Sequence, residues 1–181
     1  MKKKLIGAIV GGLLIFVWQS LSHTVLQLHS EQEGYTAKQD TIMNFLSSQL
    51  SAEGQYFMPN LPPGSSMDDM NKLGDSNKGK PWAMVTYHQA YNMDMTMALV
   101  RTFLVDFAAV LLLCWILFEM GTAGFFTIFL ASLFTGLIVF LNSFYMAHIW
   151  YQTPGLTADM IDSLVSWGLC GIWLGWWLRR K

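Results

Sequence analysis

Charged residues are scarce in this sequence. Only 13% of its 181 residues are Asp, Glu, Lys or Arg, whereas 53% are hydrophobic. A soluble domain carries about 25% charged residues. This chain therefore has too few charged residues for a protein that is surrounded by water. Its formal net charge of -1 offers no basic face to phosphates, which excludes a nucleic-acid partner. The composition indicates a membrane protein whose first partner is the lipid bilayer.

Cysteine is equally sparse. Cys114 and Cys170 both lie inside apolar runs, and the polar part of the chain contains no cysteine, which excludes a disulfide framework. A helical rise of about 1.5 Å per residue places the two thiols at different membrane depths, too far apart for a redox pair. We interpret both cysteines as small packing residues.

Long apolar runs define the expected fold. A membrane-crossing helix needs about 20 predominantly apolar residues. Four stretches qualify, at residues 5–28, 97–118, 123–146 and 160–178. The sequence therefore predicts an all-α membrane protein, a four-helix transmembrane bundle with a small segment on its outer face.

Three parts of the chain follow from these runs. Residues 1–29 form the first transmembrane helix with a basic N-terminus, residues 30–96 form an extracytoplasmic segment, and residues 97–181 form three further helices with a basic C-terminus. The first run could instead be a cleaved signal peptide, with Ser20 to Ser22 as its cleavage site. The apolar run continues past that site to Leu28, which favours an uncleaved anchor.

Basic residues at the two chain ends predict the orientation. Lys2 to Lys4 precede the first run, and Arg179 to Lys181 follow the last. An even number of spans puts both groups on one side, and the positive-inside rule makes that side cytoplasmic. We expect a multi-pass protein of the inner (cytoplasmic) membrane with both termini in the cytoplasm.

The outer segment is expected to hold short elements without a large core of its own. These are an amphipathic helix at 36–50, a short helix at 66–73 and a strand at 82–87 that pairs with 55–58. Asn92 or Asp94 is expected to cap the second spanning helix.

Polar side chains inside the predicted spans form the candidate site, which comprises Gln19, His23, Arg101, Asp106 and Asn142. The helical rise places three of them, on three helices, about 10 Å outward of the midplane. Such groups are costly in a membrane unless they face a partner or a water-filled cavity. The functional interpretation is an outward-opening polar cavity, and the alternative is interhelical hydrogen bonding worth about 0.6 kcal/mol per pair.

The four histidines lack a metal-ligand spacing. His23 and His29 are six residues apart and would point to different faces of one continuous helix. The sequence has no His-x-x-x-His or Cys-x-x-Cys pattern, so we expect no metal and no cofactor. His148 is a candidate residue at the outer interface. A weaker hypothesis makes it an acid-base group, together with Asp159, of an enzyme that acts there.

Small residues mark expected helix contacts in the third and fourth runs. The candidates are Ser132, Gly136, Gly168, Gly171 and Gly175. Small residues four apart let helix backbones approach closely. They could join helices of this chain or seat a second protein, and the first interpretation is favoured because a bundle already requires such contacts.

No catalytic constellation appears in the sequence. The leading hypothesis is therefore a non-enzymatic subunit or scaffold of a membrane complex, with other membrane protein subunits as partners. The alternative is a membrane protein that handles a small molecule, an ion or a cofactor through its outward-facing polar cluster.

Overall fold

The computed structural model describes residues 1–121 and 123–179 and is mostly helical. In chain order the elements are α1 (Lys2–Thr24), α2 (Gln39–Gln49), β1 (Gly54–Met58), α3 (Met67–Asn77), β2 (Ala83–Tyr87), α4 (Met95–Glu119), α5 (Phe125–Val139), the π-helix η1 (Phe140–Tyr145), α6 (Met146–Tyr151) and α7 (Leu156–Trp177). They form two compact units. The first unit contains Met1–Gly34 and the chain from Met93 onward, and the second contains Tyr35–Asn92.

Three helices of the first unit are long and apolar enough to cross a membrane. They are α1, α4 and the continuous helix Phe125–Tyr151, which includes α5, η1 and α6. They correspond to the predicted runs at 5–28, 97–118 and 123–146, and they support the prediction of a membrane protein. The fourth predicted run corresponds to α7, which is not among the candidate spans of the described residues. Helix α7 has two carboxylates, Asp159 and Asp162, in its first two turns.

Helix α1 ends four residues before the end of its apolar run. Its last helical residue is Thr24, and Gln27 takes a left-handed backbone conformation with φ 50°. Such a conformation is costly for a residue with a side chain, and it ends a right-handed helix. The chain therefore turns before His29, where the sequence predicted a continuous helix.

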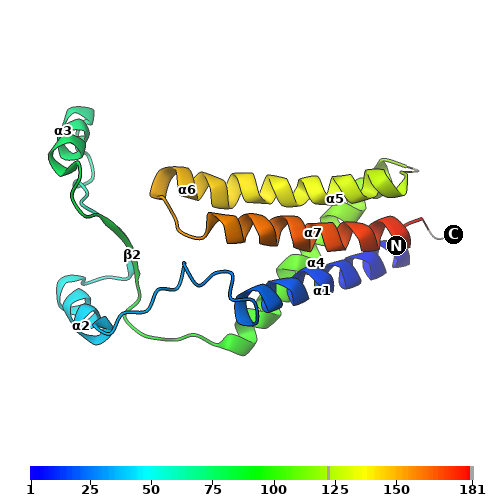
Figure 1. The fold of residues 1–181 in the computed structure, drawn as a ribbon, viewed down its shortest axis with the longest axis horizontal. Helices are drawn as coiled ribbons and strands as arrows, with labels where there is room; N and C mark the ends of the chain where they lie inside the picture. The colour runs from blue at the N-terminus through cyan, green and yellow to red at the C-terminus, as the bar shows by residue number, and fades with distance from the viewer. Residues whose placement is uncertain (122, 180–181) are drawn as a thin grey trace. The chain divides into compact units, whose positions relative to one another are not determined.

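The core of the first unit lies between four helices. Helix α7 packs against both α1 and α5, and α4 packs against α1, as Figure 1 shows. Ala8 and Ile15 of α1 and Val110 of α4 belong to this core. Cys114 and Cys170 are fully buried in the same cluster and act there as packing residues.

Small residues allow α5 and α7 to approach closely. A Cβ atom added to Gly136 would lie 2.5 Å from the Ser163 carbonyl oxygen, and one added to Gly171 would lie 2.9 Å from the Ser132 Cβ. The Ser132 hydroxyl donates to the Trp167 carbonyl oxygen at 2.8 Å. The small residues at these positions therefore make contacts within this chain.

The remaining two predicted packing residues behave differently. A Cβ added to Gly175 would lie 2.8 Å from the Phe125 ring, so this glycine also meets α5. A Cβ added to Gly168 would have its nearest neighbour, the Leu133 Cδ1, at 3.9 Å. That distance is an ordinary contact, so Gly168 is not required for the packing.

Tryptophan side chains tie α7 to α1. The indole nitrogens of Trp173 and Trp177 donate to the carbonyl oxygens of Gly7 at 3.2 Å and Lys3 at 3.0 Å. Buried indole N–H groups need such acceptors. These bonds fix the register of α7 against the first half of α1.

The second unit has the predicted short elements. Strands β1 and β2 pair antiparallel, with Gly54 opposite Tyr87 and Met58 opposite Ala83. Helices α2 and α3 match the predicted helices, and neither contains a buried residue. In the first unit Asp94 caps α4 by accepting from the Met97 backbone N–H at 3.0 Å, which confirms one of the two predicted caps.

The contact between α5 and α7 can be tested with two matched glycine substitutions. Gly171→Ala is expected to destabilise the first unit by about 1–3 kcal/mol, because overpacking forces the backbones apart. Thermal unfolding of the full chain in detergent would show a lower midpoint. Gly168→Ala has space for its methyl group and gains up to about 1 kcal/mol of helix propensity, so its midpoint should not fall. Equal losses in both variants would contradict the close contact.

Candidate ligand-binding cavity

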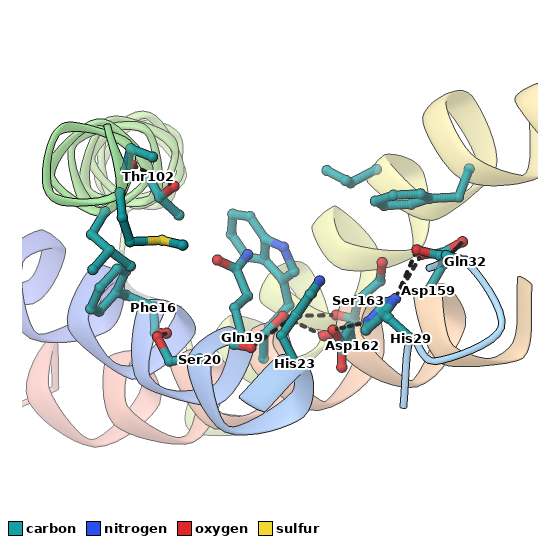
Figure 2. Close-up of a pocket in the computed structure, with 17 residues that line it drawn as sticks. Phe16, Gln19, Ser20, His23, His29, Gln32, Thr102, Asp159, Asp162 and Ser163 are labelled. Atoms are coloured by element: carbon teal, nitrogen blue, oxygen red, sulfur yellow. Dashed lines mark hydrogen bonds and ion pairs between the residues drawn. The ribbon is translucent and has the colours of Figure 1, made fainter. Parts of the chain in front are cut away.

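A cavity of about 480 Å³ lies between α1, α4, η1 and α7, all of the first unit. Part of its lining is apolar and includes Phe16, Leu99, Val139, Phe144 and Trp167. The rest is hydrogen-bonding and includes Gln19, His23, His29, Gln32, Asp159 and Asp162. Figure 2 shows these polar side chains gathered together, with Thr102 of α4 at the other end of the view.

Three segments supply the polar side chains, two of them adjacent in the sequence and the third more than 120 residues further along. Helix α1 supplies His23, the turn after α1 supplies His29 and Gln32, and the first turns of α7 supply Asp159 and Asp162. Gly155, which precedes α7, has φ 79°, and a Cβ added to it would lie 2.6 Å from the Gln32 side-chain nitrogen. Glycine at this position therefore allows Gln32 to reach Asp159.

A chain of hydrogen bonds fixes the orientation of these groups. Gln32 Nε2 donates to Asp159 Oδ1 and Oδ2 at 3.0 and 3.1 Å. Because an ionised carboxylate only accepts, this contact assigns the Gln32 nitrogen to Asp159. The Gln32 Oε1 then faces His29 Nδ1 at 3.1 Å, so Nδ1 is the donor.

The second ring nitrogen of His29 also faces an acceptor. His29 Nε2 lies 2.8 Å from Asp162 Oδ2, and Nδ1 lies 3.7 Å from Asp159 Oδ1. A neutral imidazole has one N–H, whereas the imidazolium ion has two and satisfies both contacts. The arrangement therefore suits a charged His29 between two carboxylates.

The environment of His29 agrees with this assignment. Burial alone would lower the pKa of His29, but its hydrogen bonds to Asp162 and Gln32 and the charges of Asp162 and Asp159 outweigh burial and raise the pKa above 6.5. Only 6% of the residue is exposed. Among the described lining residues, His23 is the only other group that can carry a positive charge.

His23 and Asp162 complete a compact group around His29. The rings of His23 and His29 stack, with centroids 4.0 Å apart and an interplanar angle of 14°. Trp18 Nε1 donates to Asp162 Oδ1 at 3.0 Å. One ligand atom each from His23, His29 and Asp162 lies within 4.8 Å of the other two, a spacing that could hold a metal ion.

The predicted polar cluster is divided by the structure. Gln19 and His23 line the cavity, whereas Arg101 and Asn142 are exposed and do not line it. Asp106 is buried, with 8% of its surface exposed, and has Gln19 as a hydrogen-bond partner. Its Oδ2 has no partner among the described residues. Asp106 therefore contacts a residue of the cavity without lining the cavity itself.

Two further predicted residues have local partners. The Asn142 side-chain nitrogen donates to the Ile138 carbonyl oxygen at 3.2 Å, within the helix that contains η1. His148 Nδ1 lies 2.8 Å from the Thr153 carbonyl oxygen, and Asp159 is engaged by Gln32. His148 and Asp159 therefore have different hydrogen-bond partners, the Thr153 carbonyl oxygen and the Gln32 side chain.

Sequence reasoning missed His29, Gln32 and Asp162. The expectation that His23 and His29 point apart is wrong, because it assumed a helix through both residues and α1 ends at Thr24. Asp162 falls within the predicted run at 160–178, and it lies in α7, but it was not among the candidate site residues. The available signal was Pro154-Gly155 followed by two acidic residues three apart, a pattern typical of a helix start.

Comparison of the chain with protein-family models, curated proteins and solved structures finds no match. The cavity and its residues are therefore the features of this chain that indicate a function.

The charge of His29 predicts a pH dependence of stability. Because the folded-state pKa is raised, the stabilisation is fully present below about pH 6.5 and is lost as the pH rises through the folded-state pKa. The thermal midpoint in EDTA-containing buffer should fall between about pH 6 and pH 9. His29→Gln should remove this fall, whereas His88→Gln, at an exposed residue of the second unit, should keep it. The same pH slope in His29→Gln would contradict the assignment.

Proposed function

We propose that this chain is a four-span membrane protein that binds a cation in a cavity open to the outer face. Helix α7 serves as the fourth span. Its 22 residues correspond to about 33 Å, sufficient for a hydrocarbon core of about 30 Å. Its packing against α1 and α5 supports this role, and so does the pairing of its two carboxylates with Gln32 and His29.

The arrangement of the helices supports the proposed orientation. The start of α1 and the end of α7 lie at the same end of the first unit (Figure 1). Lys2 to Lys4 lie at the start of α1, and Arg179 follows α7. The positive-inside rule therefore makes this end of the first unit cytoplasmic. The His29 turn and the start of α7 are then on the outer side of an inner membrane.

The charge of the cavity lining is the observation that carries the choice of a cation. Asp159 and Asp162 line the cavity, and no Lys or Arg is among its described lining residues. A single imidazolium at His29 leaves an excess of negative charge, which favours a cation. The rings of Phe16 and Trp167 are part of the same lining and provide faces that attract cations.

The π-helix supports this location for a site. Single π-turns inside α-helices occur frequently at functional sites. Val139, which directly precedes η1, and Phe144, near the end of η1, both line the cavity. The irregular turn therefore contributes to the wall of the cavity.

Charged thiol reagents can test both the opening and the preference for cations. A Thr102→Cys variant places a thiol in the lining, and both native cysteines are fully buried. On intact cells, a membrane-impermeant cationic methanethiosulfonate should modify this thiol faster than an anionic one of similar size. The expected ratio is about tenfold or more, after correction for their rates with a free thiol.

Leu104→Cys provides the matched control for this experiment. Leu104 lies two residues further along α4, about 200° around the helix, and is 55% exposed but absent from the cavity lining. A thiol facing lipid stays unionised and should react with neither reagent. Equal rates for the two reagents at Thr102→Cys, or no reaction there, would contradict the proposed cation cavity.

A second candidate function is that of a subunit of a membrane complex. The observation that favours it is the lack of buried residues in α2 and α3. Phe45 is 65% exposed, Met67 72% and Met70 53%, so these helices present apolar side chains that a partner protein would cover.

Purification from the native membrane tests this second function. With the full chain tagged and a mild detergent, quantitative mass spectrometry should find a partner at fixed stoichiometry. A Phe45→Ser, Met70→Ser double variant should lose that partner while remaining in the membrane at the normal level. Recovery of the wild-type chain alone would reject the subunit function.

A further inference from the structure

We propose that His23, His29 and Asp162 bind a divalent transition-metal ion, which is then the cation of the cavity. This assignment rests on the proposed cation-binding function and makes it specific. Its starting point is the spacing of one ligand atom from each of the three residues, all within 4.8 Å of one another. Each of the three side chains also has one polar atom held by a neighbour, which leaves the other atom for the ion.

His23 presents its Nε2 atom. Its Nδ1 lies 3.1 Å from the Gln19 carbonyl oxygen, and a carbonyl only accepts, so Nδ1 carries the proton. The neutral tautomer then has its lone pair on Nε2. Donation of the second ring N–H to a backbone carbonyl is the usual way in which a metal-binding histidine is oriented.

His29 and Asp162 present Nε2 and Oδ2. His29 Nδ1 is held by Gln32 Oε1 at 3.1 Å, and Asp162 Oδ1 accepts from Trp18 at 3.0 Å. The two remaining atoms face each other at 2.8 Å. A metal ion would occupy the position of the proton between them, and its binding releases that proton from His29 Nε2.

The donor set selects the class of ion. Two imidazole nitrogens and one carboxylate oxygen suit Zn²⁺ and its first-row neighbours, whereas Ca²⁺ and Mg²⁺ prefer oxygen ligands only. Three protein ligands leave one position of a tetrahedral zinc site open. All three residues line the cavity, so a water molecule or a small anion from the cavity could fill that position.

The outer contacts of the site are built as in known metal centres. Gln32, which orients His29, is itself held by the Asp159 carboxylate. Trp18 and Gln19 orient the other two ligands. Loss of such orienting contacts typically lowers metal affinity about 10- to 100-fold.

Equilibrium dialysis of the purified full chain, first stripped with EDTA, tests the assignment with Zn²⁺ as the probe. Elemental analysis should find one zinc ion per chain, and an excess of Mg²⁺ should not displace it. His23→Ala should weaken binding by at least about tenfold, because loss of a ligand costs no less than loss of an orienting contact. His88→Ala, at an exposed histidine of the second unit, should bind zinc normally.

A second variant separates a metal site from a merely structural cluster. Trp18→Phe keeps an aromatic ring but removes the donor to Asp162, and it should weaken zinc binding about tenfold or more. Thermal midpoints of the metal-free variants establish whether they are folded. Unchanged zinc affinity in folded His23→Ala and Trp18→Phe proteins would overturn the assignment, as would a wild-type chain that binds no zinc.

Failure of the metal site and failure of the cation cavity would give different results in these experiments. A faster reaction of the cationic reagent at Thr102→Cys without zinc binding would keep the cation cavity and reject the metal site. Zinc binding that depends on His23 and Trp18, with no charge selectivity at Thr102→Cys, would support the metal site and reject the wider cavity.

Discussion

Close packing of α7 against its two neighbours positions the candidate site. Gly136 and Gly171 leave no room for a Cβ atom between α5 and α7, and a Cβ at Gly11 of α1 would lie 3.0 Å from the Cys170 sulfur. Dispersion forces and close backbone approach replace the hydrophobic effect as the source of helix association in lipid. The same packing brings Asp162 to Trp18 of α1. The carboxylates of α7 therefore acquire partners only because the helices lie this close.

Burial makes the hydrogen-bonded group specific. His29 and Asp159 are each 6% exposed, and removal of one partner from a buried ion pair costs about 3–5 kcal/mol because a buried charge remains. Each hydrogen bond in the series from Asp159 through Gln32 and His29 to Asp162 also has an assigned donor and acceptor. One set of side-chain orientations satisfies all of these bonds, so the hydrogen bonds determine how the turn after α1 packs against α7.

The sequence predicts those features that local chemistry determines. A helix in lipid satisfies the hydrogen bonds of its own backbone, so the length of an apolar run alone indicates α1 and α4. Asp94 is recognisable from the sequence as an N-cap residue. The contact of His29 with Asp162 joins residues 133 apart and depends on where α1 ends. Helical periodicity applied beyond Thr24 gave the wrong direction for His29. The turn at Gln27 has no glycine or proline to reveal it.

Breaks in regular helix converge on the cavity. The turn at Gln27 lies between His23 and His29, the π-helix η1 contributes Phe144, and Gly155 before α7 contacts Gln32. All four contacted or contributed side chains line the cavity. The chain also leaves this site directly into the second unit, three residues after Gln32, and returns three residues before Met95, which lines the cavity. Both covalent connections to the second unit therefore begin close in sequence to residues that line the cavity.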